Sequence, residues 1–245
     1  MERQKYFIVL LLLIFSFTFV KASNKSDIYK AYIANDMNQW KKVMDEMNQQ
    51  KVKSNDFRLE LLNYQYGYIA WCIDNKKKEW AKLYIQLGEA NIAVLEKSGH
   101  IPSVVNSYKS AFYGYKIGLN VLKAPFIGPK SVDCAKLAIK QDDKNPYGYI
   151  QYANAQYYMP SAFGGSKQAA LKYYSKAEKL MELNQNQIKE DWNYLGVLTM
   201  IAKAYTDLKD YEHAKAYCVK ILNIEPDFLW VKNKLFPELL KKQTT

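Results

Sequence analysis

Apolar residues recur at intervals of three and four along most of the chain after residue 23, and short polar or Gly/Pro-containing clusters interrupt them. These intervals keep apolar side chains on one face of an α-helix, whereas a strand alternates every second residue. Interruptions such as NKKK, SGHIP and NQNQ suit turns between helices. The pattern therefore predicts a succession of helices, at 27–34, 36–48, 56–73, 77–97, 101–122, 130–141, 146–158, 166–182, 187–208, 211–223 and 227–241.

One stretch near the C-terminus indicates how successive helices pair. In LTMIAKAYTDLKDYEHAKAYCVKILNIEP, Ala202 and Ala214 stand twelve residues apart, and Pro226 follows the second helix. Small residues at this spacing let two antiparallel helices approach closely, while larger residues fill the gap to the next hairpin. This 34-residue pattern resembles the tetratricopeptide repeat, whose consensus has small residues and a closing proline in these slots.

Two earlier segments repeat the pattern with a longer middle. The small residues Ala153 and Ala170 are 17 residues apart rather than twelve, and so are Gly114 and Ser131. Two neighbouring hairpins are therefore expected to share the same enlarged turn. The clearest repeats fall at 110–142, 146–182 and 195–228, with degenerate units before them.

These repeats predict an all-α fold, a right-handed superhelical stack of about five helical hairpins. Each hairpin buries its apolar face only against its neighbours, so such a stack forms one continuous domain. We expect that domain to span 23–245, with a capping helix at 227–241 that begins at Phe228.

The first 22 residues carry a different signal. Arg3 and Lys5 precede an uncharged apolar stretch over 6–20, and small residues stand just before Ser23. At fifteen residues the stretch falls short of the about 20 needed to span a bilayer, and this arrangement is typical of a cleaved export signal. We expect 1–22 to be a signal peptide and the mature protein to be soluble and periplasmic, with no stable insertion in the membrane. An uncleaved anchor is the alternative.

The charge of the chain changes this picture little. The formal net charge is +11, but lysines far outnumber arginines and acidic residues are interspersed with them. Such a distribution is typical of a solvated surface, and an exported protein has little access to nucleic acid. We therefore expect no nucleic-acid partner.

The residues that usually carry chemistry are sparse. Three cysteines stand far apart without a CxxC pair, and the two histidines have no second ligand at metal-binding spacing. The stretch YYMPSAFGGSKQAAL lacks the GxxxxGK[ST] order of a phosphate-binding loop. No Ser, His and Asp residues are spaced like a known nucleophile motif. We expect no metal, no cofactor and no enzymatic activity.

The two enlarged turns invite a functional interpretation. KAPFIGPKS contains Phe126, and SAFGGSK contains Phe163; Gly164 or Gly165 suits a turn of positive φ, and Ser166 suits a helix cap. We expect the turns to pack together as a rigid lip. Their phenylalanines either close a local core or are presented to a ligand.

Tyrosines form dense runs on the first helices of successive hairpins, where they point either into the packing or toward the concave face. The stretches AFYGYKIGL and NPYGYIQYANAQYYMPSAFGGSKQAAL together resemble a group of exported tetratricopeptide-like proteins of Bacteroidetes. They are also distantly similar to the T-component subunits of tripartite ATP-independent periplasmic (TRAP) transporters. Those subunits are lipoproteins, whereas the residue directly after the expected cleavage site here is Ser23 and not Cys.

The leading hypothesis is a non-enzymatic scaffold that binds a protein or peptide partner on its concave face. The alternative is a small-ligand-binding component of an envelope uptake system, with an enclosed cavity. The candidate contact residues are Tyr108, Tyr115, Phe126, Tyr149, Gln156, Phe163 and Asn193.

Overall fold

The computed structural model describes residues 23–243, which are helical and contain no strand. The signal-peptide prediction, 1–22, lies outside the described residues. The helices are α2 (Asn24–Ile33), α3 (Met37–Gln49), α4 (Asn55–Asp74), α5 (Lys78–Ser98), α6 (Pro102–Leu119), α7 (Ala124–Gln141), α8 (Pro146–Tyr158), α9 (Lys167–Glu182), α10 (Gln185–Ile188), α11 (Trp192–Asp207), α12 (Tyr211–Ile224) and α13 (Phe236–Gln243). Two 3₁₀ turns, η1 (Val121–Lys123) and η2 (Ser161–Phe163), and a π-helical turn, η3 (Val231–Leu235), join them.

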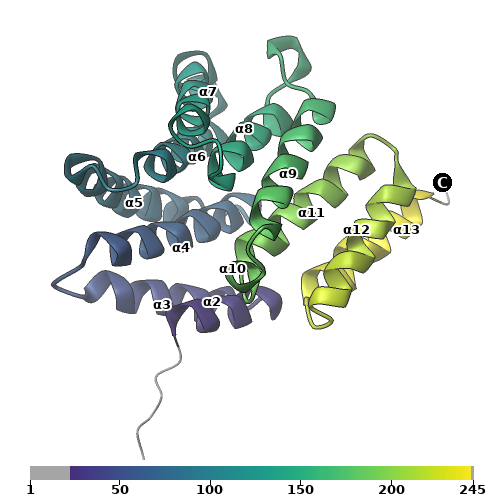
Figure 1. The fold of residues 1–245 in the computed structure, drawn as a ribbon, viewed down its shortest axis with the longest axis horizontal. Helices are drawn as coiled ribbons and strands as arrows, with labels where there is room; N and C mark the ends of the chain where they lie inside the picture. The colour runs from purple at the N-terminus through teal and green to yellow at the C-terminus, as the bar shows by residue number, and fades with distance from the viewer. Residues whose placement is uncertain (1–22, 244–245) are drawn as a thin grey trace, which may run out of the picture.

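The helices pair into five hairpins over the described residues, α2–α3, α4–α5, α6–α7, α8–α9 and α11–α12, stacked side by side (Figure 1). Most small residues of the repeat pattern lie at the contacts: Ala153, Ala170 and Ala214 are fully buried. Because alanine has only a methyl group, the paired helices approach closely there. Gly114 does not lie at a contact, because it is exposed and no atom lies within 4 Å of where its Cβ would be. The prediction of an all-α solenoid of helical hairpins is confirmed.

Three of the hairpins turn in the same compact way. Asn35, Lys76 and Lys209 each have a positive φ between the two helices of their hairpin. The α6–α7 connection contains no residue of positive φ, and the α8–α9 connection has its positive φ at a glycine, Gly164, that follows the 3₁₀ turn η2. The two hairpins with the 17-residue spacing are thus the two that depart from the common turn.

The two longer connections do not share one structure, and in this respect the sequence-based interpretation was wrong. The first insertion is helical: α7 begins at Ala124 rather than at 130 and contains Pro129. The second forms η2, where Gly164 has a φ of 92° and Ser166 caps α9 by accepting a hydrogen bond from Ala169 N. A Cβ on Gly165 would lie 1.8 Å from the carbonyl oxygen of Met159, so only glycine fits there.

The stack curves far enough for its first hairpin to meet its last. Lys25 Nζ donates to the carbonyl of Lys189 (2.8 Å), and the Tyr29 hydroxyl donates to Glu225 Oε2 (3.0 Å). Figure 1 shows α2 close to α10 and the start of α11. These contacts close the inner side of the curve, which is where the candidate site lies.

Candidate binding site on the inner face

The inner side of the curve holds a group of aromatic residues contributed by six helices. We call it the inner aromatic cluster, and its members are Tyr32, Trp40, Tyr66, Tyr108, Tyr115, Tyr147 and Trp192. Helices α2, α3, α4, α6, α8 and α11 bring these rings together because the curve places residues 32 and 192 on facing sides.

Tyr66 of α4 lies at the centre of this cluster. Its ring stacks on that of Tyr115, with centroids 5.7 Å apart and an interplanar angle of 28°. The edge of the Tyr108 ring meets it at 5.7 Å, and the Trp192 ring lies at 5.9 Å. Offset and edge-on ring contacts of this kind add to the free energy gained by burying the rings, so Tyr66 fixes the arrangement of its neighbours.

The two indoles pack against the backbone of α4 at a glycine. The Trp40 and Trp192 rings are 5.1 Å apart, and a Cβ on Gly67 would lie 2.7 Å from the first and 2.8 Å from the second. Real Cβ atoms do not approach carbon so closely, so this contact requires glycine. The absence of a side chain at Gly67 therefore allows both indole rings to contact the backbone of α4.

Polar side chains of α8 line one side of the cluster. Asn154 Nδ2 donates to Gln151 Oε1 (2.9 Å) and lies 3.4 Å from the Tyr66 hydroxyl, while Asn154 Oδ1 accepts a bond from Tyr174 (2.6 Å). Burial raises the pKa of Tyr66, and the nearby amides of Gln151 and Asn154 act to lower it. The Tyr66 hydroxyl thus stays neutral at physiological pH.

Two buried donors at the cluster have no hydrogen-bond partner within the protein. They are the indole Nε1 of Trp192 and the amide Nε2 of Gln151, which lies near the Tyr66 hydroxyl without a bond of good geometry. An unsatisfied buried donor costs about 1–3 kcal/mol. A ligand atom that accepts a hydrogen bond from either donor would remove this cost.

A carboxylate borders the same region. Asp191 caps α11 by accepting bonds from Asn193 N (2.8 Å) and Asn193 Nδ2 (3.1 Å). Burial raises the pKa of Asp191, and these hydrogen bonds oppose the shift. Burial, with a contribution from the Asp191 charge, also raises the pKa of Tyr147.

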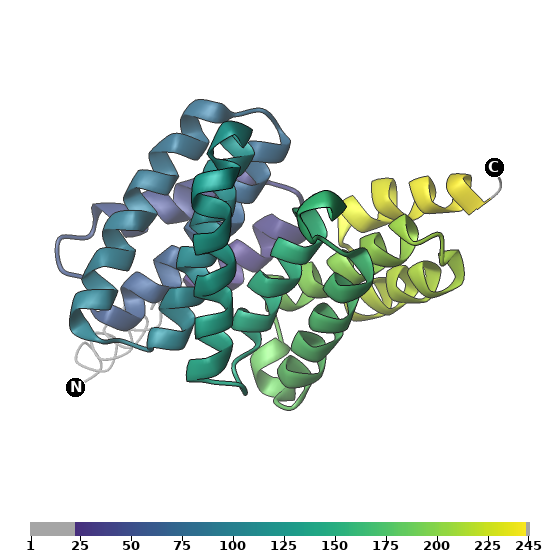
Figure 2. The same cartoon turned by 90° about the horizontal axis from the view of Figure 1, so that it is seen from above.

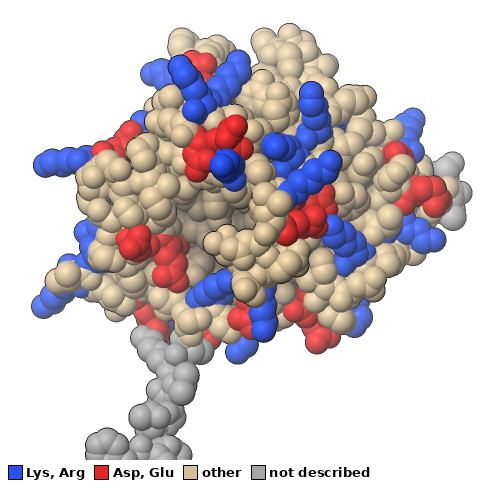
Figure 3. Space-filling model, viewed as in Figure 1, with Lys and Arg blue, Asp and Glu red and all other residues tan. Residues whose placement is uncertain are grey.

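Tyr158, at the end of α8, lies at the surface of the molecule. The Tyr158 side chain is 64% exposed, yet burial, followed by the charges of Asp74 and Asp207, raises its pKa. Figure 3 shows a hollow near the centre of this face, with walls formed mostly of uncharged residues.

The predicted contact residues divide between two environments. Tyr108 and Tyr115 belong to the inner aromatic cluster, where Tyr108 donates to Asn63 Oδ1 (2.9 Å) and Tyr115 to the carbonyl of Tyr66 (3.0 Å). Gln156 and Asn193 are buried in helix packing, and the ring of Tyr149 stacks on that of Tyr173 instead of joining the cluster.

Phe126 and Phe163 are exposed, by 77% and 76% respectively. The interpretation that they close a local core is therefore wrong, because neither ring is covered. Tyr66 and Trp192, which the sequence did not single out as contact residues, lie at the centre of the cluster. The Tyr64, Tyr66 and Tyr68 run was visible in the sequence, but pairing it with residue 192 required the curvature of the stack.

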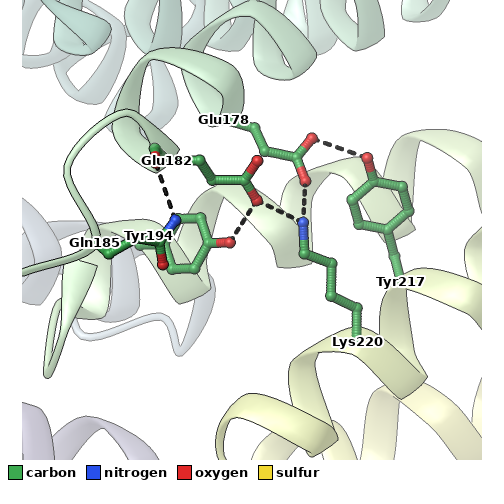
Figure 4. Close-up of polar contacts among 6 residues, drawn as sticks. All are labelled: Glu178, Glu182, Gln185, Tyr194, Tyr217 and Lys220. Carbon is green, nitrogen blue, oxygen red and sulfur yellow. Dashed lines mark hydrogen bonds and ion pairs between the residues drawn. The ribbon is translucent and has the colours of Figure 1, made fainter.

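A second polar group joins the last two hairpins (Figure 4). Lys220 Nζ lies 2.7 Å from Glu178 Oε1 and 2.6 Å from Glu182 Oε1, while Tyr217 and Tyr194 donate to the two carboxylates. Burial acts to raise the pKa of Glu182, but the bonds from Lys220 and Tyr194 lower it overall. Because these charges are paired with one another, the group is a structural link between α9 and α12.

The described residues also bear on three other possibilities, a metal site, a reactive thiol and a membrane span. No group of three or more His, Cys, Asp or Glu side chains there is arranged to hold a metal ion. Cys72 and Cys218 are buried, and burial raises the pKa of each thiol to about 11. None of the helices described is both long and apolar enough to cross a membrane.

Comparisons with known proteins agree with the fold. A model of the tetratricopeptide repeat matches residues 195–228. No curated protein matches the sequence. Among solved structures, the HusA haemophore from Porphyromonas gingivalis is similar, with a TM-score of 0.58 and 14% identity over 76% of this chain and 96% of that one. At this identity the likeness concerns the fold, which is that of a tetratricopeptide-like helical protein.

Proposed function

We propose that the protein is a non-enzymatic binding protein whose inner aromatic cluster takes a flat, largely apolar small molecule. The observation that carries this proposal is the buried, unpartnered indole N–H of Trp192 within a group of stacked rings. Ligand sites in proteins are typically apolar and aromatic, with a few polar groups that fix orientation. The rings supply stacking surface, and Trp192 and Gln151 supply the donors.

The chemistry of the similar structure supports the same class of ligand. That protein is described as a haemophore, and its fold is shared over most of this chain. Haem is a flat macrocycle with carboxylate acceptors, which suits stacked rings beside free donors. If residues 1–22 act as an export signal, binding would take place outside the cytoplasm.

The test titrates haemin and metal-free protoporphyrin IX into the chain that begins at Ser23, with tryptophan fluorescence and porphyrin absorbance as readouts. We expect saturable binding of both, because the cluster offers phenols and indoles but no His or Cys. Trp192→Phe keeps a ring and removes the donor, so it should weaken binding about tenfold, as expected for the loss of one hydrogen bond.

The matched control is Trp80→Phe. Trp80 is 44% exposed and stacks on Tyr84, outside the inner aromatic cluster, so its replacement should leave the affinity unchanged. Absence of saturable binding of either porphyrin, or equal affinity in the parent and Trp192→Phe, would contradict the proposal.

A second candidate is binding of a protein or peptide segment along the hollow. The tetratricopeptide pattern at 195–228 and the accessible ring of Tyr158 favour it, since an extended peptide would reach that ring from solvent. Native mass spectrometry of tagged chain recovered from envelope extract separates the two. A stoichiometric protein, with no bound small mass, would support the scaffold.

A further inference from the structure

A group of large apolar side chains projects from one edge of the molecule, away from the inner aromatic cluster. We call it the apolar edge, and its members are Val121, Leu122, Phe126 and Phe163, which are 70%, 78%, 77% and 76% exposed. They come from the α6–α7 and α8–α9 connections, the two that depart from the common hairpin turn. Helix α7 and η2 lie at the top of Figure 1, opposite α2 and α3, and both face the viewer in Figure 2.

The chain around this edge carries charge of one sign. Residues 97–132 and 144–177 contain nine lysines and no aspartate or glutamate. Elsewhere acidic residues are interspersed with the lysines, so the two segments without acids coincide with the exposed apolar side chains. The acids that border the two segments along the chain are Glu96, Asp133, Asp143 and Glu178.

Several of these lysines are already paired within the protein. Lys109 pairs with Glu96, Lys116 with Glu89, and Lys167 with Asp207.

Two others, Lys123 and Lys130, are exposed and flank Phe126 directly. Lys123 follows Leu122, and Lys130 lies one helical turn beyond Phe126. The apolar edge therefore carries cations next to its most exposed side chains.

We propose that the apolar edge docks on the surface of a bilayer that contains anionic phospholipids. Exposed apolar side chains enter the boundary between headgroups and acyl chains, and lysines beside them contact anionic headgroups. Side chains on projecting turns suit a soft, fluid surface, which needs no complementary shape. The docking is peripheral, since no described helix spans a membrane.

The test measures co-sedimentation with vesicles of phosphatidylcholine alone and with vesicles that also contain phosphatidylglycerol. Residues 23–243 contain the entire fold described above, so the chain begins at Ser23, without the apolar segment 6–20 that would itself attach to lipid. We expect binding to the anionic vesicles, weaker binding to the neutral ones, and a decrease with added salt.

Two variants test the two parts of the edge. Phe126→Ala/Phe163→Ala and Lys123→Gln/Lys130→Gln should each reduce partitioning roughly tenfold, because each removes two groups that contact the lipid. All four positions are exposed, so the fold should survive both changes. The matched control is Val52→Ala/Leu183→Ala, two side chains 88% and 82% exposed in other connections, which should bind like the parent.

The proposal is overturned if the parent does not bind anionic vesicles, or if either edge variant binds them as well as the control does. In those cases a partner protein becomes the better explanation for the exposed edge. Porphyrin binding in the edge variants should equal that of the parent, so the outcome is independent of the proposed ligand site.

Discussion

At the scale of single residues, one glycine and one indole N–H shape the inner aromatic cluster. Gly67 admits two indoles against the backbone of α4, and the buried Nε1 of Trp192 has no hydrogen-bond partner within the protein. Both properties depend on contacts between residues more than a hundred positions apart, and each is tested by a small change.

Gly67→Ala should destabilise the protein by about 1–3 kcal/mol, because the new methyl group would overlap Trp40 and Trp192. Gly114→Ala is the control: it is exposed on α6 with no atom within 4 Å of the new Cβ, and it should stabilise the fold by about 0.5–1 kcal/mol. Urea denaturation of both variants measures the difference. Equal stabilities would mean that the indoles do not pack on Gly67.

At the scale of elements, polar groups link helices that apolar packing already brings together. The best example is Lys220 of α12 between Glu178 and Glu182 of α9. Glu178 is buried, so leaving it without its partner would cost far more than the loss of a surface ion pair.

This group predicts a pH dependence of stability. The pKa of Glu182 is lowered in the folded state, so its contribution is present above the ordinary glutamate pKa of 4.5 and is lost as the pH falls through the folded value. Because Glu182 is partly exposed, we expect about 1 kcal/mol or less. Urea denaturation between pH 7 and pH 3 should show a smaller loss in Glu182→Gln than in the parent; an equal loss would contradict the assignment.

At the scale of the whole molecule, the first and last hairpins touch. Repeat proteins usually contact only neighbouring units, so stability is additive along the stack. Here Tyr32 and Phe228 have ring centroids 4.9 Å apart, and Tyr29 bonds to Glu225. The contact couples α2 to the C-terminal cap.

Phe228→Ala should therefore increase hydrogen exchange in α2, nearly two hundred residues away in sequence. The loss of this buried ring costs about 3–5 kcal/mol, and part of that loss should appear at the N-terminal hairpin. Leu239→Ala, also buried but in α13, should affect the last helices alone. Unchanged exchange in α2 would show that the closing contact does not couple the two ends.

The sequence alone determined the helices, their pairing and the spacing of the small residues. Ala153, Ala170, Ala202 and Ala214 predicted the hairpins because helix contacts within and between neighbouring repeats are local and follow a fixed period. The cap at Ser166 and the positive φ of Gly164 were local as well.

Only the tertiary structure decided the conformation of the two insertions and the contacts between distant helices. The two insertions have similar composition, but one continues as helix and the other turns at glycine, because the outcome depends on the packing around them. The meeting of Tyr66 with Trp192 follows from small rotations added over several hairpins. A periodic pattern specifies the rotation between successive hairpins only loosely. The total curvature of the stack, and with it the inner aromatic cluster, is therefore set by the tertiary packing.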